Sequence, residues 1–166
     1  MCRVSLDIST SSTGYAVYEK DVLLSSGVIQ PKGKLAKDRF PGMVHSIADV
    51  LDQNHPSKII VEGFYCANSF ASVEYILKLH GTVEIWAIDH NTEYKVLAPS
   101  SWRKTLGFPT KKGSDREKRE AFKQAGILLA ENILGRPPIC DDEADAVCIG
   151  YADYVSAYLI EEKRFK

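Results

Sequence analysis

The sequence predicts an α/β fold: a mixed five-stranded sheet, with three antiparallel strands followed by two parallel strands, flanked by helices. Three observations favour this fold. Residues 3–8 alternate apolar and polar side chains, which is typical of a strand, and a predicted hairpin follows over 14–29. Beyond them, short apolar runs take turns with segments of helical period. The 166 residues, 45% of them hydrophobic and 26% charged, fit one packed domain over 1–166.

The antiparallel part of the sheet is predicted at the start of the chain. Residues 3–8 alternate with a period of two, as in a half-buried strand. Segments 14–18 and 22–29 flank the short polar connection 19–21, which indicates a hairpin. We therefore expect three consecutive antiparallel strands.

A helix and a buried strand follow. Apolar residues recur at helical spacing over 40–51, with Pro41 near the predicted start and Pro56 after the end. Residues 58–62 form a short apolar run that ends in a carboxylate, which is typical of a buried strand. A second helix is predicted over 73–83, with Ser69 as its cap.

The last third of the chain is predicted to be mostly helical. A strand over 94–98 comes first and ends before a proline. The capping box 114–117 then opens a helix that we expect to end near Gly126. Asp141 is the expected N-cap of a terminal helix whose apolar face reaches Tyr158.

Four carboxylates are the candidate functional groups. Asp7 lies in a strand between apolar neighbours, Glu62 ends another strand, and Asp142 and Asp145 share one face of the last helix. Several buried carboxylates are tolerated together when a hard cation such as Mg²⁺ neutralises them, as in two-metal phosphoryl chemistry. Taken singly, Asp141 and Asp142 also fit helix capping and Glu62 fits a solvated strand end. Asp7 has no such local role.

Three segments carry a resemblance to a known family: LDISTSSTGYAV over 6–17, IVEGFY over 60–65, and DEADA over 142–146. In order and spacing they resemble the RuvC-type Holliday-junction resolvases of the ribonuclease H-like superfold, most closely the short forms carried by bacteriophages. The resemblance spans nearly the whole chain and implies a ribonuclease H-like nuclease domain with two Mg²⁺ ions, or Mn²⁺ in their place. It implies the catalytic and metal-binding quartet Asp7, Glu62, Asp142 and Asp145.

The resemblance also implies contacts with DNA and with a second subunit. An aromatic residue of the family works at the junction's branch point just after the second acid, a place held here by Tyr65 with Phe64 beside it. Stacking on an unpaired base would suit either ring, and a core position is the alternative for both. The core position is favoured for Phe64, and Tyr65 is the better candidate for stacking. The apolar face of helix 69–89 resembles the family's dimer element, and ordinary core packing is the other interpretation.

A basic stretch over 103–123 is the predicted path of the DNA backbone. It holds eight Lys and Arg against three Asp and Glu, so it carries +5 of a chain whose net charge is -1, and the rest carries -6. Glu-Lys interleaving indicates a solvated helix face for part of it. The remaining cations suit phosphate contacts, and a lysine near the metals could stabilise charge on the phosphate. The candidate residues are Arg103, Lys104, Lys111, Lys112 and Lys118, with Lys111 and Lys118 as the choices for the catalytic lysine.

The expected function is therefore that of a Mg²⁺-dependent, structure-selective endodeoxyribonuclease. It would resolve four-way and related branched DNA junctions as a homodimer, by paired phosphodiester hydrolysis. An RNA-processing nuclease of the same superfold and a non-catalytic junction-binding protein are the alternatives. The loop 7–14 also looks like the phosphate loop of actin-like ATPases and sugar kinases, but 166 residues do not supply their second lobe.

The expected location is the cytoplasm, of a bacterial host cell if a phage encodes the protein. The four cysteines form no C-x-x-C pair, which favours reduced thiols. Asp7 lies where a signal peptide would carry its apolar core, and no apolar run approaches the ~20 residues of a membrane span. We therefore expect a soluble protein with no membrane partner.

Overall fold

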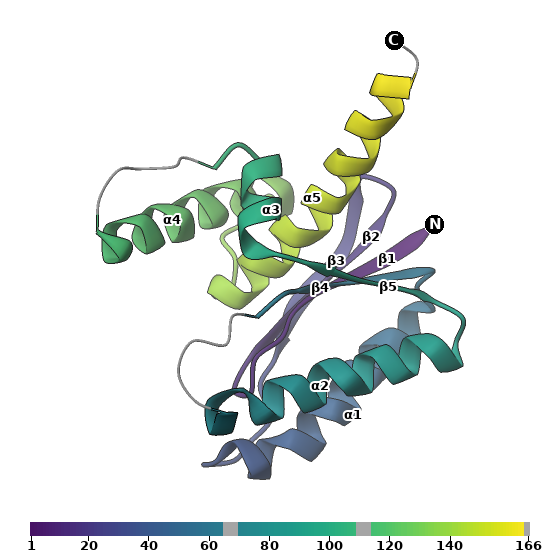
Figure 1. Cartoon of the computed structure of the whole chain (residues 1–166), viewed down its shortest axis with the longest axis vertical. Coiled ribbons are helices and arrows are strands. Elements are labelled where there is room, and N and C mark those ends of the chain that lie inside the picture. The colour runs from purple at the N-terminus through teal and green to yellow at the C-terminus, as the bar shows by residue number, and fades with distance from the viewer. Residues whose placement is uncertain (65–69, 109–113, 165–166) are drawn as a thin grey trace.

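The computed structural model describes the backbone of residues 1–64, 70–108 and 114–164, and their side chains except those of 70–72 and 161–164 (Figure 1). In chain order the elements are β1 (Cys2–Asp7), β2 (Thr13–Glu19), β3 (Val22–Ile29), α1 (Ala36–Asn54), β4 (Lys58–Glu62), α2 (Phe70–Asp89), β5 (Glu93–Leu97), α3 (Pro99–Thr105), α4 (Asp115–Leu134) and α5 (Asp141–Arg164).

The five strands form one sheet in the order β3-β2-β1-β4-β5. β1 pairs with β2 and β2 with β3 in antiparallel directions, whereas β4 lies parallel to both β1 and β5. The predicted mixed sheet, three antiparallel strands and then two parallel ones, is confirmed. Because β1 and β4 are parallel neighbours, their last residues, Asp7 and Glu62, end at the same edge of the sheet.

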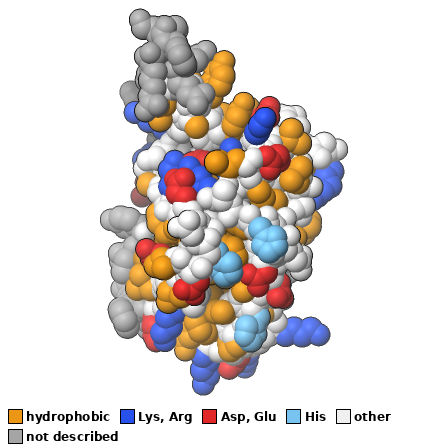
Figure 2. Space-filling view, turned by 90° about the vertical axis from the view of Figure 1, so that its right-hand side faces the viewer, with side chains coloured by type: hydrophobic (Ala, Val, Ile, Leu, Met, Phe, Trp, Pro, Cys, Tyr) orange, Lys and Arg blue, Asp and Glu red, His pale blue; other side chains and the backbone are white. Residues whose placement is uncertain are grey.

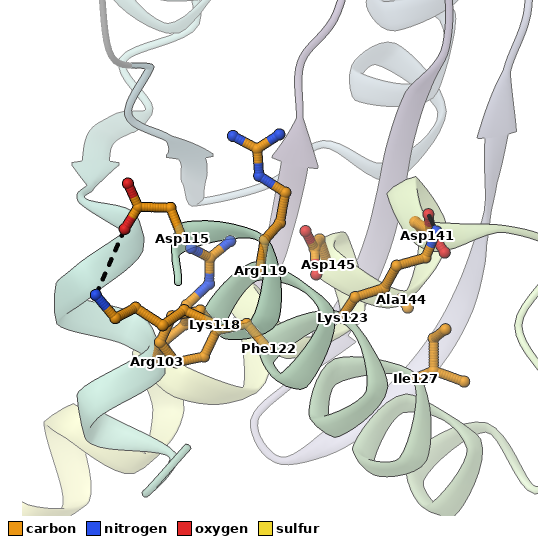
Figure 3. A pocket seen from close by; sticks show the side chains of 10 residues that line it. All are labelled: Arg103, Asp115, Lys118, Arg119, Phe122, Lys123, Ile127, Asp141, Ala144 and Asp145. Atoms are coloured by element: carbon orange, nitrogen blue, oxygen red, sulfur yellow. Dashed lines mark hydrogen bonds and ion pairs between the residues drawn. The ribbon is translucent and has the colours of Figure 1, made fainter. Parts of the chain in front are cut away.

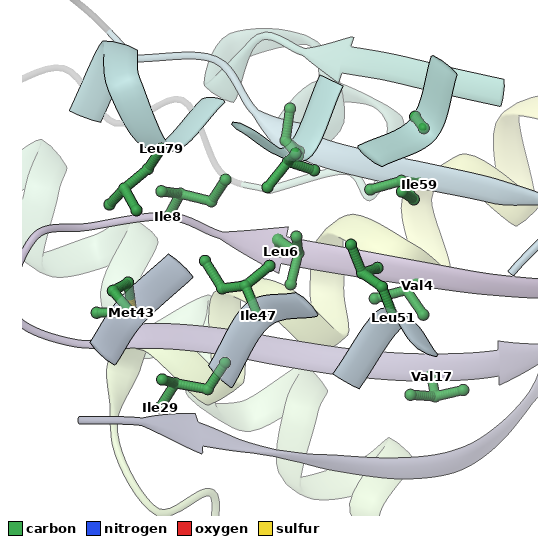
Figure 4. Close-up of a cluster of buried hydrophobic side chains, with 13 residues drawn as sticks. Val4, Leu6, Ile8, Val17, Ile29, Met43, Ile47, Leu51, Ile59 and Leu79 are labelled. Carbon is green, nitrogen blue, oxygen red and sulfur yellow. The ribbon is translucent and has the colours of Figure 1, made fainter. Parts of the chain in front are cut away.

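Helices cover both faces of the sheet. α1 and α2 lie on one face, and α3, α4 and α5 lie on the other (Figure 1). Figure 4 shows the first face, where Leu6 of β1 packs with Ile47 of α1 in a cluster of buried aliphatic side chains. None of the helices within the described residues is both long and apolar enough to cross a membrane.

β1 is buried on both faces, which differs from the half-buried strand predicted for 3–8. Val4 and Leu6 face α1, and Ser5, on the other face, is fully buried under α5. A polar residue is tolerated there because the Ser5 hydroxyl donates a hydrogen bond to the carbonyl of Ala146, at 2.7 Å. Tyr18 of β2 likewise donates to the carbonyl of Val147, at 2.8 Å. Two neighbouring strands thus hold α5 by side-chain hydroxyls.

Two glycines let α5 lie unusually close to the sheet. A Cβ at Gly14, the partner of Asp7 in the β1–β2 register, would lie 1.8 Å from the carbonyl oxygen of Asp142. On the helix side, a Cβ at Gly150 would lie 2.5 Å from the ring of Tyr18. The start of α5 therefore rests on the hairpin directly beside Asp7.

The structure corrects the predictions for α4 and α3. α4 continues past Gly126 to Leu134 and ends at Gly135, whose φ of 67° is the left-handed conformation that glycine adopts readily. Gly126 instead marks a close approach, since a Cβ there would lie 3.3 Å from a carboxylate oxygen of Asp145. The unpredicted helix α3 has only seven residues, too few to show a helical period.

The other helix boundaries also shift. α1 begins at Ala36 rather than near 40, because the Asp38 carboxylate accepts a hydrogen bond from the Leu35 amide at 3.0 Å. Asp141 is the first residue of α5 rather than its N-cap. The apolar face of α5 is buried as far as Ala152, in the middle of the helix, whereas Tyr158 is 53% exposed. The predicted Ser69 cap lies outside the described residues.

Replacing Gly14 by alanine should destabilise the protein. The new methyl group would overlap the backbone of Asp142, so α5 must shift away from the hairpin. We expect the free energy of unfolding in urea to fall by roughly 1–3 kcal/mol or more, as for other overpacked positions. Gly81→Ala is the control, because no atom of the described residues lies within 4 Å of the added Cβ and alanine favours the helix. Equal stability of the two variants would contradict the close packing of α5.

Candidate metal centre and its cleft

Three of the four predicted carboxylates meet at the edge of the sheet. One oxygen each from Asp7, Glu62 and Asp145 lies within 4.8 Å of the other two. Parallel pairing brings Asp7 and Glu62 together, and the close approach of α5 at Gly14 adds Asp145. An all-oxygen set of this size is the kind of site that hard divalent cations such as Mg²⁺ or Mn²⁺ occupy.

The fourth predicted residue, Asp142, lies next to this cluster and not within it. Among the described residues, the group of mutually close carboxylates contains only Asp7, Glu62 and Asp145. The negative charge of Asp142 nevertheless raises the pKa of Asp7 and of Asp145, and its carboxylate accepts a weak hydrogen bond from the Cys140 thiol at 3.8 Å. Asp142 is therefore close enough to act on the cluster electrostatically.

Burial and mutual repulsion favour the protonated carboxyls. Desolvation, followed by the charges of Glu62, Asp145 and Asp142, raises the pKa of Asp7 well above its ordinary value. Desolvation, followed by the charge of Glu62, raises the pKa of Asp145 to about 7. Burial also raises the pKa of Glu62, against the opposing effects of Trp102 and Arg103. A divalent cation would relieve this repulsion, so the cluster fits a metal.

Trp102 and Arg103 of α3 hold Glu62 in place. The indole nitrogen of the fully buried Trp102 donates a hydrogen bond to Glu62 Oε1 at 2.8 Å, and the Arg103 guanidinium lies 3.6 Å from the same oxygen. The guanidinium also lies over the rings of Trp102 and Phe122, with its Cζ 4.7 and 5.3 Å from their centroids. Glu62 is thus not a simple solvated strand end.

Arg103 was predicted to contact phosphates, and Trp102 was not among the predicted site residues. Arg103 lies at the acidic cluster, where its charge lowers the pKa of Asp7, Glu62 and Asp145. Trp102 precedes it in a helix too short to show periodicity, and 40 residues separate it from Glu62. No local pattern could have joined the two, although a tryptophan beside an arginine after Pro99 was a visible signal.

A cleft of about 510 Å³ opens beside Asp145, between the first half of α4, the first turn of α5 and Arg103 of α3 (Figure 3). Lys118 of the predicted set lines it, paired with Asp115 at 3.4 Å, and Lys123 lies at its other end, paired with Asp141 at 2.5 Å. The cations lining the cleft are Arg103, Lys118, Arg119 and Lys123. On the side of the molecule shown in Figure 2, the described lysines and arginines stand in small groups among acidic and hydrophobic side chains.

A second cavity, of about 980 Å³, lies across Arg103 from the cleft. Phe64 and Lys104, two of the predicted DNA-contacting residues, line it. Phe64 is 39% exposed, and its ring lies edge-on to the ring of His80, with 5.1 Å between the centroids. Its environment is thus intermediate between that of a core residue and that of a fully exposed aromatic ring. Tyr65, Lys111 and Lys112 lie outside the described residues.

Two acids at adjacent ends of parallel strands, with a third on the helix that crosses the mixed sheet, define the ribonuclease H-like class of nuclease folds. Within this class, the family model of the crossover junction endodeoxyribonuclease RuvC matches residues 4–151. The chain belongs to this family of junction-cutting endodeoxyribonucleases.

Individual relatives agree with this family. A crossover junction endodeoxyribonuclease RuvC of Oleidesulfovibrio alaskensis is 22% identical over 149 residues, 87% of either chain. RuvC of Thermus thermophilus, solved in complex with a Holliday junction substrate, matches with a TM-score of 0.74 and 18% identity over 96% of both chains. The fowlpox virus resolvase, solved with substrate Holliday junction DNA, matches with a TM-score of 0.61 and 20% identity over 96% of this chain and 99% of its own. Both structural likenesses show that the fold is shared.

The raised pKa of Asp145 predicts a pH-dependent stability of the metal-free protein. The folded carboxyl keeps its proton up to about pH 7, whereas the unfolded chain releases it near 3.8. Its contribution to stability is thus complete below pH 4 and is lost as the pH rises to 7. In urea titrations with a chelator, we expect Asp145→Asn to gain stability relative to the wild type as the pH rises from 4 to 7.

Asp153→Asn provides the control of opposite sign. Burial of Asp153 is outweighed by hydrogen bonds from Lys95 and Lys58, which lower its pKa, so its stabilising effect is lost as the pH falls. Asp153→Asn should therefore lose stability relative to the wild type as the pH rises towards 3.8, and should show almost no further change between pH 4 and 7. Parallel trends for the two variants would contradict the assigned environment of Asp145.

Proposed function

We propose that this protein resolves four-way and related branched DNA junctions as a Mg²⁺-dependent homodimer, by hydrolysing one phosphodiester in each of two strands. The observation that supports it best is the meeting of Asp7, Glu62 and Asp145 beside a cation-lined cleft. The family to which the chain belongs, and two solved relatives bound to Holliday junction DNA, support the choice of substrate. The cytoplasm, where recombining DNA is accessible in a bacterial cell, is the proposed site of action.

In this proposal Asp7, Glu62 and Asp145 hold two Mg²⁺ ions, with Asp142 as a fourth ligand from the adjoining turn of α5. When bound, the ions supply an activated water and stabilise the leaving oxygen of an in-line displacement. The oxygen donors, their close spacing and the raised pKa values of Asp7 and Asp145 fit such ions. Mn²⁺, with similar ligand preferences, could replace Mg²⁺.

The chain's own residues orient Glu62 and the scissile strand. Trp102 and Arg103 fix the Glu62 carboxylate, so its oxygens keep one orientation. Arg103 and Lys118 face the same cleft, where they would neutralise phosphate charge next to the acids. Lys104, Lys111 and Lys112 are proposed to bind phosphates farther along the backbone, and Tyr65, with Phe64, to stack on bases at the branch point.

The proposed dimer uses the exposed apolar side of α2. Leu77, Ile85 and Ile88 are 43%, 59% and 72% exposed. A shallow groove of about 260 Å³ between α1 and α2 adjoins them and is lined mainly by apolar side chains, including Val44 and Trp86. A four-way junction presents two equivalent strands, and a two-fold dimer would present an active site to each.

A gel assay tests the function directly. A labelled four-way junction, a linear duplex of the same sequence and an RNA–DNA hybrid are incubated with the protein, with and without Mg²⁺. We expect paired nicks in the junction only, in Mg²⁺ only, that leave 5′-phosphate and 3′-hydroxyl ends. Cleavage of the hybrid alone would favour an RNA-processing nuclease, and binding of the junction without cleavage in Mg²⁺ would favour a junction-binding protein.

Asp7→Asn should abolish cleavage and retain junction binding, because the amide keeps the shape of the strand end but removes a ligand charge. We expect the single-turnover rate of junction cleavage to fall by roughly 100-fold or more. This is a larger loss than is typical for residues that only hydrogen-bond to a metal ligand. Asp142→Asn and Asp145→Asn should behave alike. Asp141→Asn is the control, since its partially exposed pair with Lys123 contributes little. Near wild-type cleavage by Asp7→Asn would disprove the metal assignment.

Ile88→Glu should weaken the dimer, because it places a charge on the proposed apolar interface. We expect the dimer dissociation constant from analytical ultracentrifugation to rise at least ~10-fold, which corresponds to about 1.4 kcal/mol. Leu128→Glu is the matched control, since Leu128 is similarly exposed, at 62%, on α4. If only the control variant dissociates, the interface lies elsewhere.

A further inference from the structure

Glu143 stands between two proposed metal ligands in the sequence, yet its carboxylate is fully buried and fully engaged elsewhere. It accepts hydrogen bonds from the Ser26 hydroxyl at 2.7 Å and from the Ile139 amide at 2.6 Å. The Arg136 guanidinium donates to both of its oxygens, at 2.6 and 3.2 Å. A buried carboxylate with this many donors, one of them a bidentate arginine, is strongly fixed.

These partners come from three parts of the fold. Ser26 belongs to β3, Arg136 and Ile139 to the connection between α4 and α5, and Glu143 itself to the first turn of α5. One carboxylate therefore joins the edge strand, the connection and the start of the helix. The hydroxyls of Ser5 and Tyr18 hold later residues of α5, and the pair of Asp141 with Lys123 is half exposed, so Glu143 supplies the buried tether nearest to the helix terminus.

The helix terminus is where a tether matters for the metal centre. Asp142 is the second residue of α5, and the first turn of a helix lacks the intrahelical bonds that hold its interior. The next bond into the helix is from the Ala144 amide to the Cys140 carbonyl, at 3.2 Å. Loss of the Glu143 tether would let this turn move while the later turns stay anchored.

We propose that Glu143 is a positioning residue for the metal centre: it fixes the first turn of α5 so that Asp142 and Asp145 face Asp7 and Glu62. The role rests on the proposed function only in taking these four carboxylates as the metal ligands. Without the Glu143 tether, Asp142 and Asp145 lose their alignment with the other two carboxylates. Metal affinity then falls by more than the loss of overall stability would cause.

The chain offers a matched control on the same helix. Asp153 is also a buried carboxylate of α5, only 3% exposed, and it binds Lys95 at 2.7 Å and Lys58 at 3.0 Å. These two partners, and Arg3 of β1 at 3.9 Å, lie away from the strand ends that carry Asp7 and Glu62. Asp153→Asn therefore loosens α5 without touching its first turn.

The test measures metal affinity without reference to cleavage. Mg²⁺ and Mn²⁺ are titrated into the protein in a Trp86→Phe background, and the fluorescence of Trp102, which donates to Glu62, reports binding. Calorimetry with Mn²⁺ provides a second readout, and urea unfolding gives the stability of each variant. We expect Glu143→Gln to weaken metal binding roughly 10-fold or more, the range typical of residues that orient metal ligands.

Asp153→Asn should lower the free energy of unfolding about as much as Glu143→Gln does. The midpoint of its metal titration should stay within about twofold of the wild-type value, as expected for an independent site. Arg136→Gln, at a side chain 45% exposed, is the milder variant if Glu143→Gln fails to fold, and should shift the midpoint in the same direction. An unchanged midpoint in Glu143→Gln, or equal shifts in the Glu143 and Asp153 variants, would overturn the positioning role. A wild-type protein that binds no metal would instead overturn the metal centre, and the role with it.

Discussion

The repulsion among carboxylates at one edge of the sheet is the constraint on which the rest of the structure depends. Oxygens of Asp7, Glu62 and Asp145 lie within 4.8 Å of one another in a partly desolvated site. Like charges this close raise one another's pKa, and the buried surroundings strengthen the effect. The fold must therefore supply enough binding energy elsewhere to hold together groups that repel each other until a cation arrives.

The docking of α5 on the sheet supplies much of that energy. Gly14 and Gly150 remove the side chains that would separate helix and strands, and the hydroxyls of Ser5 and Tyr18 bind helix carbonyls. On the other flank, Trp102 stabilises the Glu62 carboxylate by a direct hydrogen bond. The acidic cluster is thus braced from two sides by neutral donors and close packing, which leaves its own oxygens available for metal ions.

Much of the fold, and the acids themselves, could be predicted because their signals are local. The alternation around Asp7 and the apolar run before Glu62 indicate strands, and an acid in an apolar strand is unusual without a partner. What could not be predicted depends on tertiary contacts. Gly126 is a close-approach residue rather than a helix end, and the buried Glu143 tether involves residues up to 117 positions apart. The sequence also placed Asp142 in the quartet, whereas the distances set it beside the cluster of three.

The order of the three acids along the chain has a consequence for how the protein is made. Asp145 is synthesised long after Asp7, and their encounter closes a loop that contains most of the 166 residues. Until α5 has emerged and docked, Asp7 and Glu62 lack Asp145, and a nascent chain has only part of the cluster. Metal binding, and with it any capacity to cut DNA, is in this way coupled to completion of folding. Chains that stall or are truncated before α5 would therefore not cut DNA.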